Sequence, residues 1–151
     1  KYLPDGRCDY TYQTDCDAGL KEYKETYADP FVEVLSMYAK KVPIVIVVEP
    51  DSLPNLATNL DDPRCGGKAT IQAYQQGVKY ALEVLTRKVP EVAVYLDAAH
   101  GGWLGWQDNL MDFMNMLKRM DLPFSKMRGF ATNVANYQPL GALCPYKADD
   151  G

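Results

Sequence analysis

The chain has 151 residues, of which 47% are hydrophobic and 11% aromatic, which is enough apolar material for the core of one ordinary domain. Its 16 basic and 20 acidic residues give a net charge of −4 and are spread along the sequence, which argues against a nucleic-acid binder with a basic patch. No apolar stretch approaches the roughly 20 residues needed to span a bilayer. We therefore expect neither nucleic acid nor a membrane as a partner.

The first half of the sequence predicts a loop, a long helix, a strand and a short helix. Residues 4–18 form a turn-rich, cysteine-bearing loop. From 20 to about 40, apolar residues recur at helical spacing, at Tyr23, Tyr27, Phe31, Val34, Leu35 and Tyr38. The β-branched run 44–49 is typical of a strand that is buried on both faces. A short helix follows and ends near Thr58.

The second half continues this alternation. Its predicted elements are a loop at 61–67, a helix at 70–88, and strands at 92–97 and 127–132 on either side of a helix at 109–120. Alternating helices and buried strands indicate parallel strands joined by crossovers. Three strands are too few for a closed barrel, and the chain opens without a methionine. We therefore expect an excerpt of a larger α/β domain, with further strands on both sides.

Two of the predicted strands deliver an aspartate to their carboxyl end. Asp51 follows the strand 44–49, and Asp97 ends the strand 92–97. Ligands gather at this edge of parallel sheets, so both acids are candidates for chemistry. As a general acid, Asp51 would need a pKa raised by burial and by the like charge of Glu49. The alternative, which the local sequence favours, is that Asp51 caps the following helix.

The residues after the second and third strands also allow two interpretations. Asp97 and His100 have a D-x-x-H spacing, which can hold a metal ion. The chain has a single histidine, which leaves such a site short of ligands, so we expect no metal. We expect His100 to form a hydrogen bond within the rim instead. Trp103 and Trp106 suit a platform for a sugar ring, and they equally suit core packing under their loop. Asn133 would bind substrate hydroxyls or shape its turn.

Cofactor motifs are absent, and the cysteines leave their pairing open. No dinucleotide fingerprint, phosphate loop or catalytic-triad pattern occurs, so the sequence predicts no cofactor. Cys8, Cys16, Cys65 and Cys144 contain no C-x-x-C pair. An even number at loop-like positions fits disulfides in an oxidising compartment, with three possible pairings. Four reduced, partly buried thiols are the alternative.

Three motifs of this sequence resemble glycoside hydrolase family 6. They are V-V-E-P-D-S-L-P-N-L-A-T-N-L at 47–60, Y-L-D-A-A-H-G-G-W-L-G-W at 95–106 and R-G-F-A-T-N-V-A-N-Y at 128–137. Members of this family are cellobiohydrolases and endoglucanases that cleave β-1,4-glucan with inversion on a distorted, partly open β/α barrel. The resemblance implies that 1–151 is a partial catalytic domain, an α/β fold forming an incomplete TIM-like barrel with about three parallel strands.

The resemblance also implies roles for single residues. Asp51 matches the general acid of the family, and Asp97 matches an aspartate at the centre of the cleft. The implied substrate-binding residues are Trp103 and Trp106, as sugar platforms on the leaving-group side, with His100 and Asn133 as further cleft residues. Cys8 and Cys65 match a family disulfide, whose closure would stabilise the fold by roughly 4 kcal/mol.

One position departs from the family pattern. The family reads L-P-x-R-D-C, with an aspartate that supports the acid, whereas this chain places Arg7 there. An arginine beside Asp51 would favour the ionised carboxylate, the wrong state for a proton donor. From the resemblance as a whole we expect a secreted, monomeric enzyme that hydrolyses cellulose or cellodextrins with inversion. This chain is part of its catalytic domain, and we expect it to be inactive alone. The alternative is a glucan-binding relative that has lost turnover.

Overall fold

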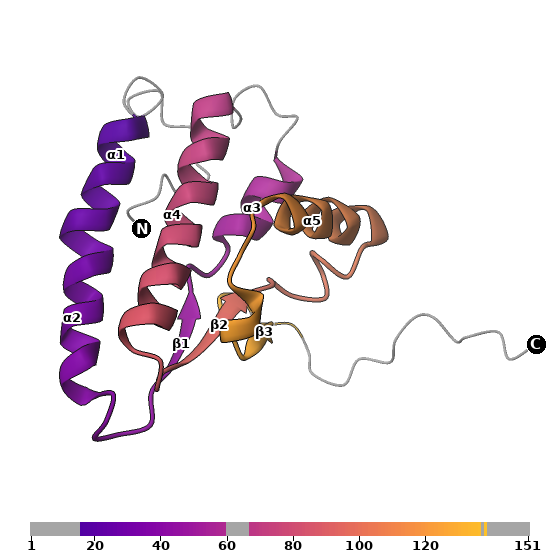
Figure 1. The fold of residues 1–151 in the computed structure, drawn as a ribbon. Coiled ribbons are helices and arrows are strands. Elements are labelled where there is room, and N and C mark those ends of the chain that lie inside the picture. The colour runs from indigo at the N-terminus through magenta and orange to yellow at the C-terminus, as the bar shows by residue number, and fades with distance from the viewer. Residues whose placement is uncertain (1–15, 60–66, 137, 139–151) are drawn as a thin grey trace, which may run out of the picture.

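The fold is a three-stranded parallel sheet with helices packed on it, as the alternation in the sequence predicts (Figure 1). This computed structural model describes residues 16–59, 67–136 and 138. The strands are β1 (Val45–Val48), β2 (Ala93–Asp97) and β3 (Gly129–Ala131). The helices are α1 (Cys16–Glu22), the π-helix η1 (Tyr23–Ala28), α2 (Asp29–Tyr38), α3 (Ser52–Thr58), α4 (Lys68–Lys88), α5 (Gln107–Arg119) and the 3₁₀ turn η2 (Phe124–Lys126).

The predicted element boundaries are close to the observed ones, with one correction at the start. Helix α1 begins at Cys16, so the end of the loop expected over 4–18 is helical. The rest of that loop, up to residue 15, lies outside the described residues, as does the loop at 61–67 apart from its last residue.

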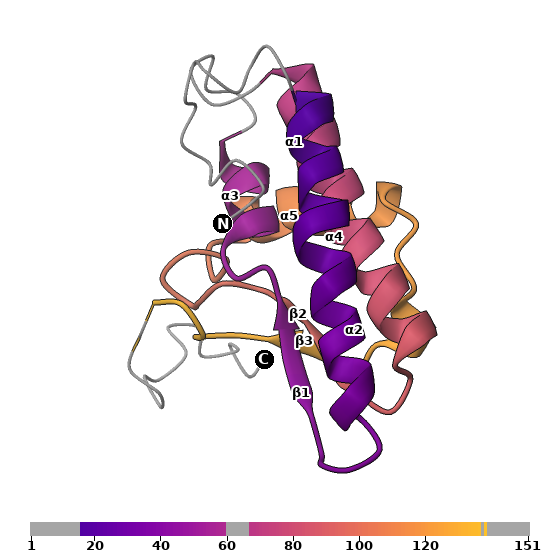
Figure 2. The ribbon, with the colours of Figure 1, turned by 90° about the vertical axis from the view of Figure 1, so that its left-hand side faces the viewer.

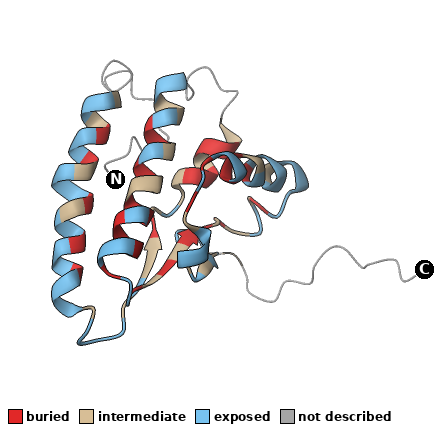
Figure 3. Cartoon of the chain, in the orientation of Figure 1, coloured by how far each residue is buried: buried red, intermediate tan, exposed pale blue. Residues whose placement is uncertain are grey.

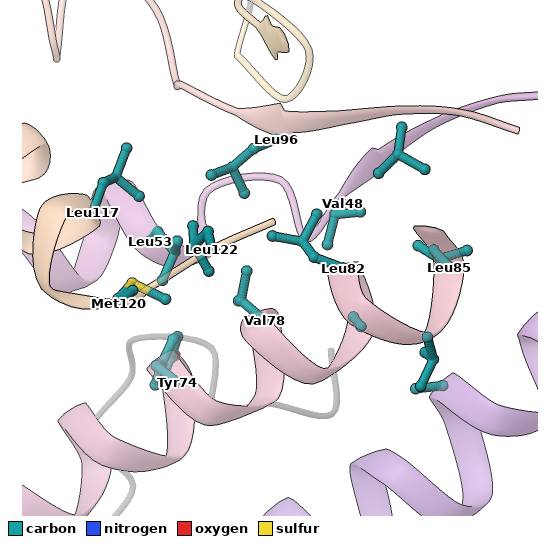
Figure 4. Close-up of a cluster of buried hydrophobic side chains, with 14 of the residues drawn as sticks. Val48, Leu53, Tyr74, Val78, Leu82, Leu85, Leu96, Leu117, Met120 and Leu122 are labelled. Carbon is teal, nitrogen blue, oxygen red and sulfur yellow. The ribbon is translucent and has the colours of Figure 1, made fainter. Parts of the chain in front are cut away.

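The core lies between the sheet and α4. Val48 of β1 and Leu96 of β2 face the helix, which meets them with Val78, Leu82 and Leu85 (Figure 4). These three residues of α4 recur at intervals of four and three positions, so they share one face of the helix. Figure 3 shows that the buried residues gather on the inner sides of the helices and that the outer sides are exposed.

The opposite face of the sheet is open, which corrects the expectation of a strand buried on both faces. Val45 is 64% exposed, and Val47 and Tyr95 are only half-buried. In the described ranges the helices lie on one side of the three strands, and no helix covers the other side (Figure 2). Parallel sheets are normally covered on both faces, so this arrangement fits one part of a larger barrel.

The buried face of the first helical stretch differs from the prediction because of η1. A regular helix would bury Tyr23, Tyr27 and Phe31 together, yet Tyr27 and Phe31 are both 37% exposed. Instead, Ala28 and the later residues Val32 and Leu35 continue the buried stripe begun by Tyr23. A π-helix closes i→i+5 hydrogen bonds and so takes one more residue per turn. This extra residue moves the buried stripe on by one position.

Candidate active site

Parallel pairing of β1 and β2 brings their two terminal aspartates together. Val48 lies opposite Leu96 in the register, so both strands end at the same edge of the sheet. The backbone N–H of Asp51 donates a hydrogen bond to Oδ2 of Asp97 at 2.9 Å. The two acids predicted from separate strand ends therefore belong to one cluster.

Asp51 lies in a tight turn between β1 and α3 that uses the left-handed region of backbone space. Glu49 has a φ of 44° and Asp51 a φ of 67°, with Pro50 between them. The backbone N–H and the hydroxyl of Ser52 both donate to the carbonyl of Glu49, at 3.1 and 2.8 Å. The N–H of Asn55 donates to the carbonyl of Asp51 at 2.9 Å. These bonds close the turn and start the helix.

The side chain of Asp51 does not cap the helix that follows. Asp51 occupies the N-cap position of α3, but its carboxylate makes no capping hydrogen bond. The local sequence favoured this capping role, and the structure contradicts it. Within the described ranges no hydrogen bond to the Asp51 carboxyl is formed, and the residue is half-buried.

Asp97 is buried beneath the turn that carries Asp51. Its side chain is 1% exposed, and Oδ2 also accepts the N–H of Ala99 at 3.1 Å. Its Oδ1 atom has no hydrogen-bond partner among the described residues. Burial raises the pKa of Asp97, against the two backbone N–H groups from Asp51 and Ala99, which lower it. Asp97 thus anchors the backbone of Asp51 directly.

The loop after β2 holds the two tryptophans in different environments. Trp103 is half-buried and packs against the core, and its indole N–H donates to the hydroxyl of Thr58 on α3 at 3.2 Å. Trp106 is 66% exposed, and its indole N–H donates to the carbonyl of Gly102 at 3.3 Å. Core packing thus describes Trp103 in part, whereas Trp106 is exposed to solvent.

His100 and Asn133 both take part in contacts within the rim. The ring of His100 lies 5.9 Å from that of Trp103, and its Nε2 atom is 3.1 Å from the amide nitrogen of Asn136, which confirms the expected hydrogen bond. The amide of Asn133 donates to the carbonyl of Gln138 at 2.9 Å and accepts the N–H of Gln138 at 2.7 Å. Asn133, with a φ of 66°, therefore shapes its own turn.

One residue of this region was not found from the sequence. Tyr23 is buried, and its hydroxyl donates to Oε1 of Glu49 at 2.8 Å. The two residues are 26 positions apart, and the helical pattern indicated only that Tyr23 lies on an apolar face. Other expectations fall on undescribed residues, namely the Cys8–Cys65 disulfide and the position of Arg7.

Neither a metal cluster nor a membrane-spanning helix occurs in the part of the chain that the structure describes. No three side chains of His, Cys, Asp or Glu come together there as metal ligands. No helix in the same ranges is long and apolar enough to cross a bilayer.

The profile of glycosyl hydrolases family 6 matches residues 8–150. The chain belongs to this family. It is 45% identical over 132 residues to the 1,4-beta-D-glucan cellobiohydrolase CEL6B of Podospora anserina, a match that covers 83% of this chain and 30% of the relative. The family resemblance of the three motifs is thereby confirmed.

Solved structures of family 6 show the same fold. The catalytic domain of Cellulomonas fimi Cel6B matches with a TM-score of 0.72 at 40% identity, over 82% of this chain and 28% of that one. Cellobiohydrolase II (CEL6A) of Humicola insolens, in complex with glucose and cellotetraose, matches with a TM-score of 0.70 at 36% identity, over 83% of this chain and 34% of that one. The chain thus spans about a third of these relatives and forms one part of the family 6 barrel.

Proposed function

We propose that the complete protein containing this chain hydrolyses β-1,4-glucosidic bonds of cellulose or cellodextrins with inversion. The observation that carries the proposal is the Asp51 turn, which holds a carboxyl group at the sheet edge and is fixed by the buried Asp97 at 2.9 Å. The Podospora relative is named a cellobiohydrolase, and the Humicola structure contains cellotetraose. Both names support a β-1,4-glucan as the substrate.

In this mechanism Asp51 is the general acid. It gives its proton to the glycosidic oxygen as the bond to the anomeric carbon breaks. Asp97 fixes the backbone of Asp51, and negative charge at this position favours the oxocarbenium character of the transition state. The exposed ring of Trp106 provides a flat apolar surface on which a sugar ring packs.

Inversion further requires a water molecule activated on the opposite face of the sugar, with the two carboxyl groups roughly 6.5–9.5 Å apart. Asp97 does not fit that task, because it is buried directly under the turn of Asp51. This chain spans 30% of the Podospora relative, so we infer that the remaining parts of the reaction centre are supplied from outside it. Accordingly, the chain alone is expected to be inactive.

The decisive test replaces the acid in the complete protein. With cellotetraose as substrate, Asp51→Asn should lower the rate of hydrolysis by about 10²–10⁴-fold, because the leaving oxygen loses its proton donor. Affinity for cellotetraose should persist. Asp121→Asn is the matched control, since that side chain is 97% exposed. Proton NMR of the wild-type reaction should show the α-anomer as the first product, and a β-anomer would refute inversion.

A second candidate function is glucan binding without turnover. It is favoured by Arg7, which stands where the family carries an aspartate and which lies outside the described residues. Binding of cellotetraose with no hydrolysis between about pH 4 and pH 8 would support this candidate and refute the enzymatic one.

We further propose that the protein acts outside the cell as a monomer. The location follows from the substrate, because cellulose is an insoluble polymer that does not enter cells. Recovery of the protein from the culture medium, at the hydrodynamic size of one chain, would test both parts.

A further inference from the structure

The turn that carries Asp51 is held by the helical layer as well as by β2. Tyr23, the first residue of η1, is 1% exposed and donates its hydroxyl hydrogen to Oε1 of Glu49 at 2.8 Å. We propose that Tyr23 is a positioning residue, which acts through Glu49 to keep the turn in the conformation that presents Asp51. This inference rests on the proposed function only in taking Asp51 as the proton donor.

The backbone of this turn needs support from its surroundings. A left-handed conformation is unfavourable for a residue with a side chain, and Glu49 and Asp51 both adopt it. Such conformations persist where the neighbouring structure fixes them. Ser52 holds the carbonyl of Glu49, and Asp97 holds the N–H of Asp51. The hydrogen bond from Tyr23 is a further restraint on this turn, and it acts on the side chain of Glu49.

The winding of η1 explains how a bulky tyrosine reaches this position. The buried Ala28 lies five positions after the buried Tyr23, whereas Tyr27, one position before Ala28, is partly exposed. The wide π-helical turn thus places both Tyr23 and the small residue Ala28 on the buried face of the helix. Single π-helical turns are frequent at functional sites.

The chemistry of the pair fixes the direction of the hydrogen bond. Burial first, and the adjacent Glu49 second, raise the pKa of Tyr23 far above its ordinary value of 10.0. The phenol therefore stays protonated and donates, and the carboxylate of Glu49 accepts. Loss of the hydroxyl would remove one restraint on a side chain that lies two residues from Asp51 in the turn.

Tyr23→Phe tests this role, with Tyr80→Phe as the matched control. The control deletes a hydroxyl that donates to Oδ2 of Asp29 at the same distance of 2.8 Å, in a contact between α4 and α2. In the complete protein, Tyr23→Phe should speed hydrogen exchange of the amides at Asp51 and Ser52 on the order of tenfold, because a hydrogen bond to a charged group is lost. Tyr80→Phe should leave these amides unchanged.

Kinetics with cellotetraose provide the second measurement. Tyr23→Phe should lower kcat on the order of tenfold while KM stays within about twofold, because the lost bond orients the acid rather than the sugar. Glu49→Ala breaks the same link from the other side, so the double variant should be no slower than the slower single variant. Additive losses in the double variant would overturn the proposal.

Two further outcomes would also overturn it. The first is unchanged exchange at Asp51 and Ser52 in Tyr23→Phe, and the second is an equal increase in Tyr80→Phe. Exchange does not depend on turnover, so a protein that binds glucan without hydrolysing it would refute the proposed function and still allow this test. Should Tyr23→Phe unfold, Glu49→Ala tests the same restraint with the buried ring intact.

Discussion

Removal of the Asp97 carboxylate should destabilise the protein far more than its replacement by an amide. Oδ2 of Asp97 accepts the backbone N–H groups of Asp51 and Ala99, at 2.9 and 3.1 Å. Asp97→Ala leaves both donors without an acceptor, and each unsatisfied buried group costs about 1–3 kcal/mol. The sum is about 2–6 kcal/mol, and relaxation of the left-handed Asp51 places the expected loss in the lower half of that range.

Asp97→Asn keeps a carbonyl oxygen of nearly the same shape at the same place. Both backbone bonds can then persist, although they lose the strength that a charged acceptor gives. We expect a loss of about 1–2 kcal/mol, which is offset in part because a buried charge is removed. Asp112→Ala is the control for deletion of a carboxylate, because this residue is exposed within α5 and should contribute little.

The difference between Asp97→Asn and the wild type should depend on pH. Burial raises the pKa of Asp97 above its ordinary value of 3.8. The folded protein therefore holds this proton to a higher pH than the unfolded chain does. The contribution of the protonated Asp97 to the free energy of unfolding is complete below pH 3.8, and it is lost as the pH rises through the pKa of Asp97 in the folded protein. The amide does not titrate, so the deficit of Asp97→Asn should shrink over the same range.

Denaturant unfolding of the complete protein measures these differences, and hydrogen exchange at Asp51 and Ala99 locates them. The expected order of stability is wild type, Asp97→Asn and then Asp97→Ala, with faster exchange at both amides in the alanine variant. Equal stability of the alanine and asparagine variants would refute the anchoring role. So would an Asp97→Asn deficit that grows as the pH rises.

Two further predictions concern the loop after β2. At Gly105 an added Cβ would lie 2.0 Å from the carbonyl oxygen of Gly101, so Gly105→Ala should force the loop to shift and lower the free energy of unfolding by about 1–3 kcal/mol. The control is Gly101→Ala, whose Cβ would meet no atom within 4 Å and which should leave the free energy of unfolding unchanged. Trp106→Ala should weaken cellotetraose binding by about 0.5–1.5 kcal/mol in calorimetry and leave the melting temperature unchanged, because this residue is 66% exposed. A lower melting temperature with unchanged affinity would contradict a platform role.

Local patterns in the sequence account for most of the secondary structure. The β-branched runs predicted β1 and β2, and the spacing of apolar residues predicted α4, because alternation and helical periodicity are properties of neighbouring residues. The placement of Asp51 and Asp97 at one edge also followed, since parallel strands end together. The family was recognisable from the same strand ends and the loops after them.

Other features depended on contacts that no local pattern encodes. The extra residue of η1 shifted the buried stripe from Tyr27 to Ala28, because a π-helical turn breaks the period that the prediction assumed. The open face of β1 was missed because a run of Val and Ile shows that a strand is apolar but not what covers each side.

The sequence by itself therefore determined the strands, their order of appearance and the acids at their ends. Only the tertiary structure decided how these acids are placed relative to each other. It buried Asp97 under the backbone of Asp51, and it brought Tyr23 to Glu49. The reason is physical, since both contacts join segments that are distant in the chain. They depend on strand register and helix winding, which are fixed only when the whole core packs.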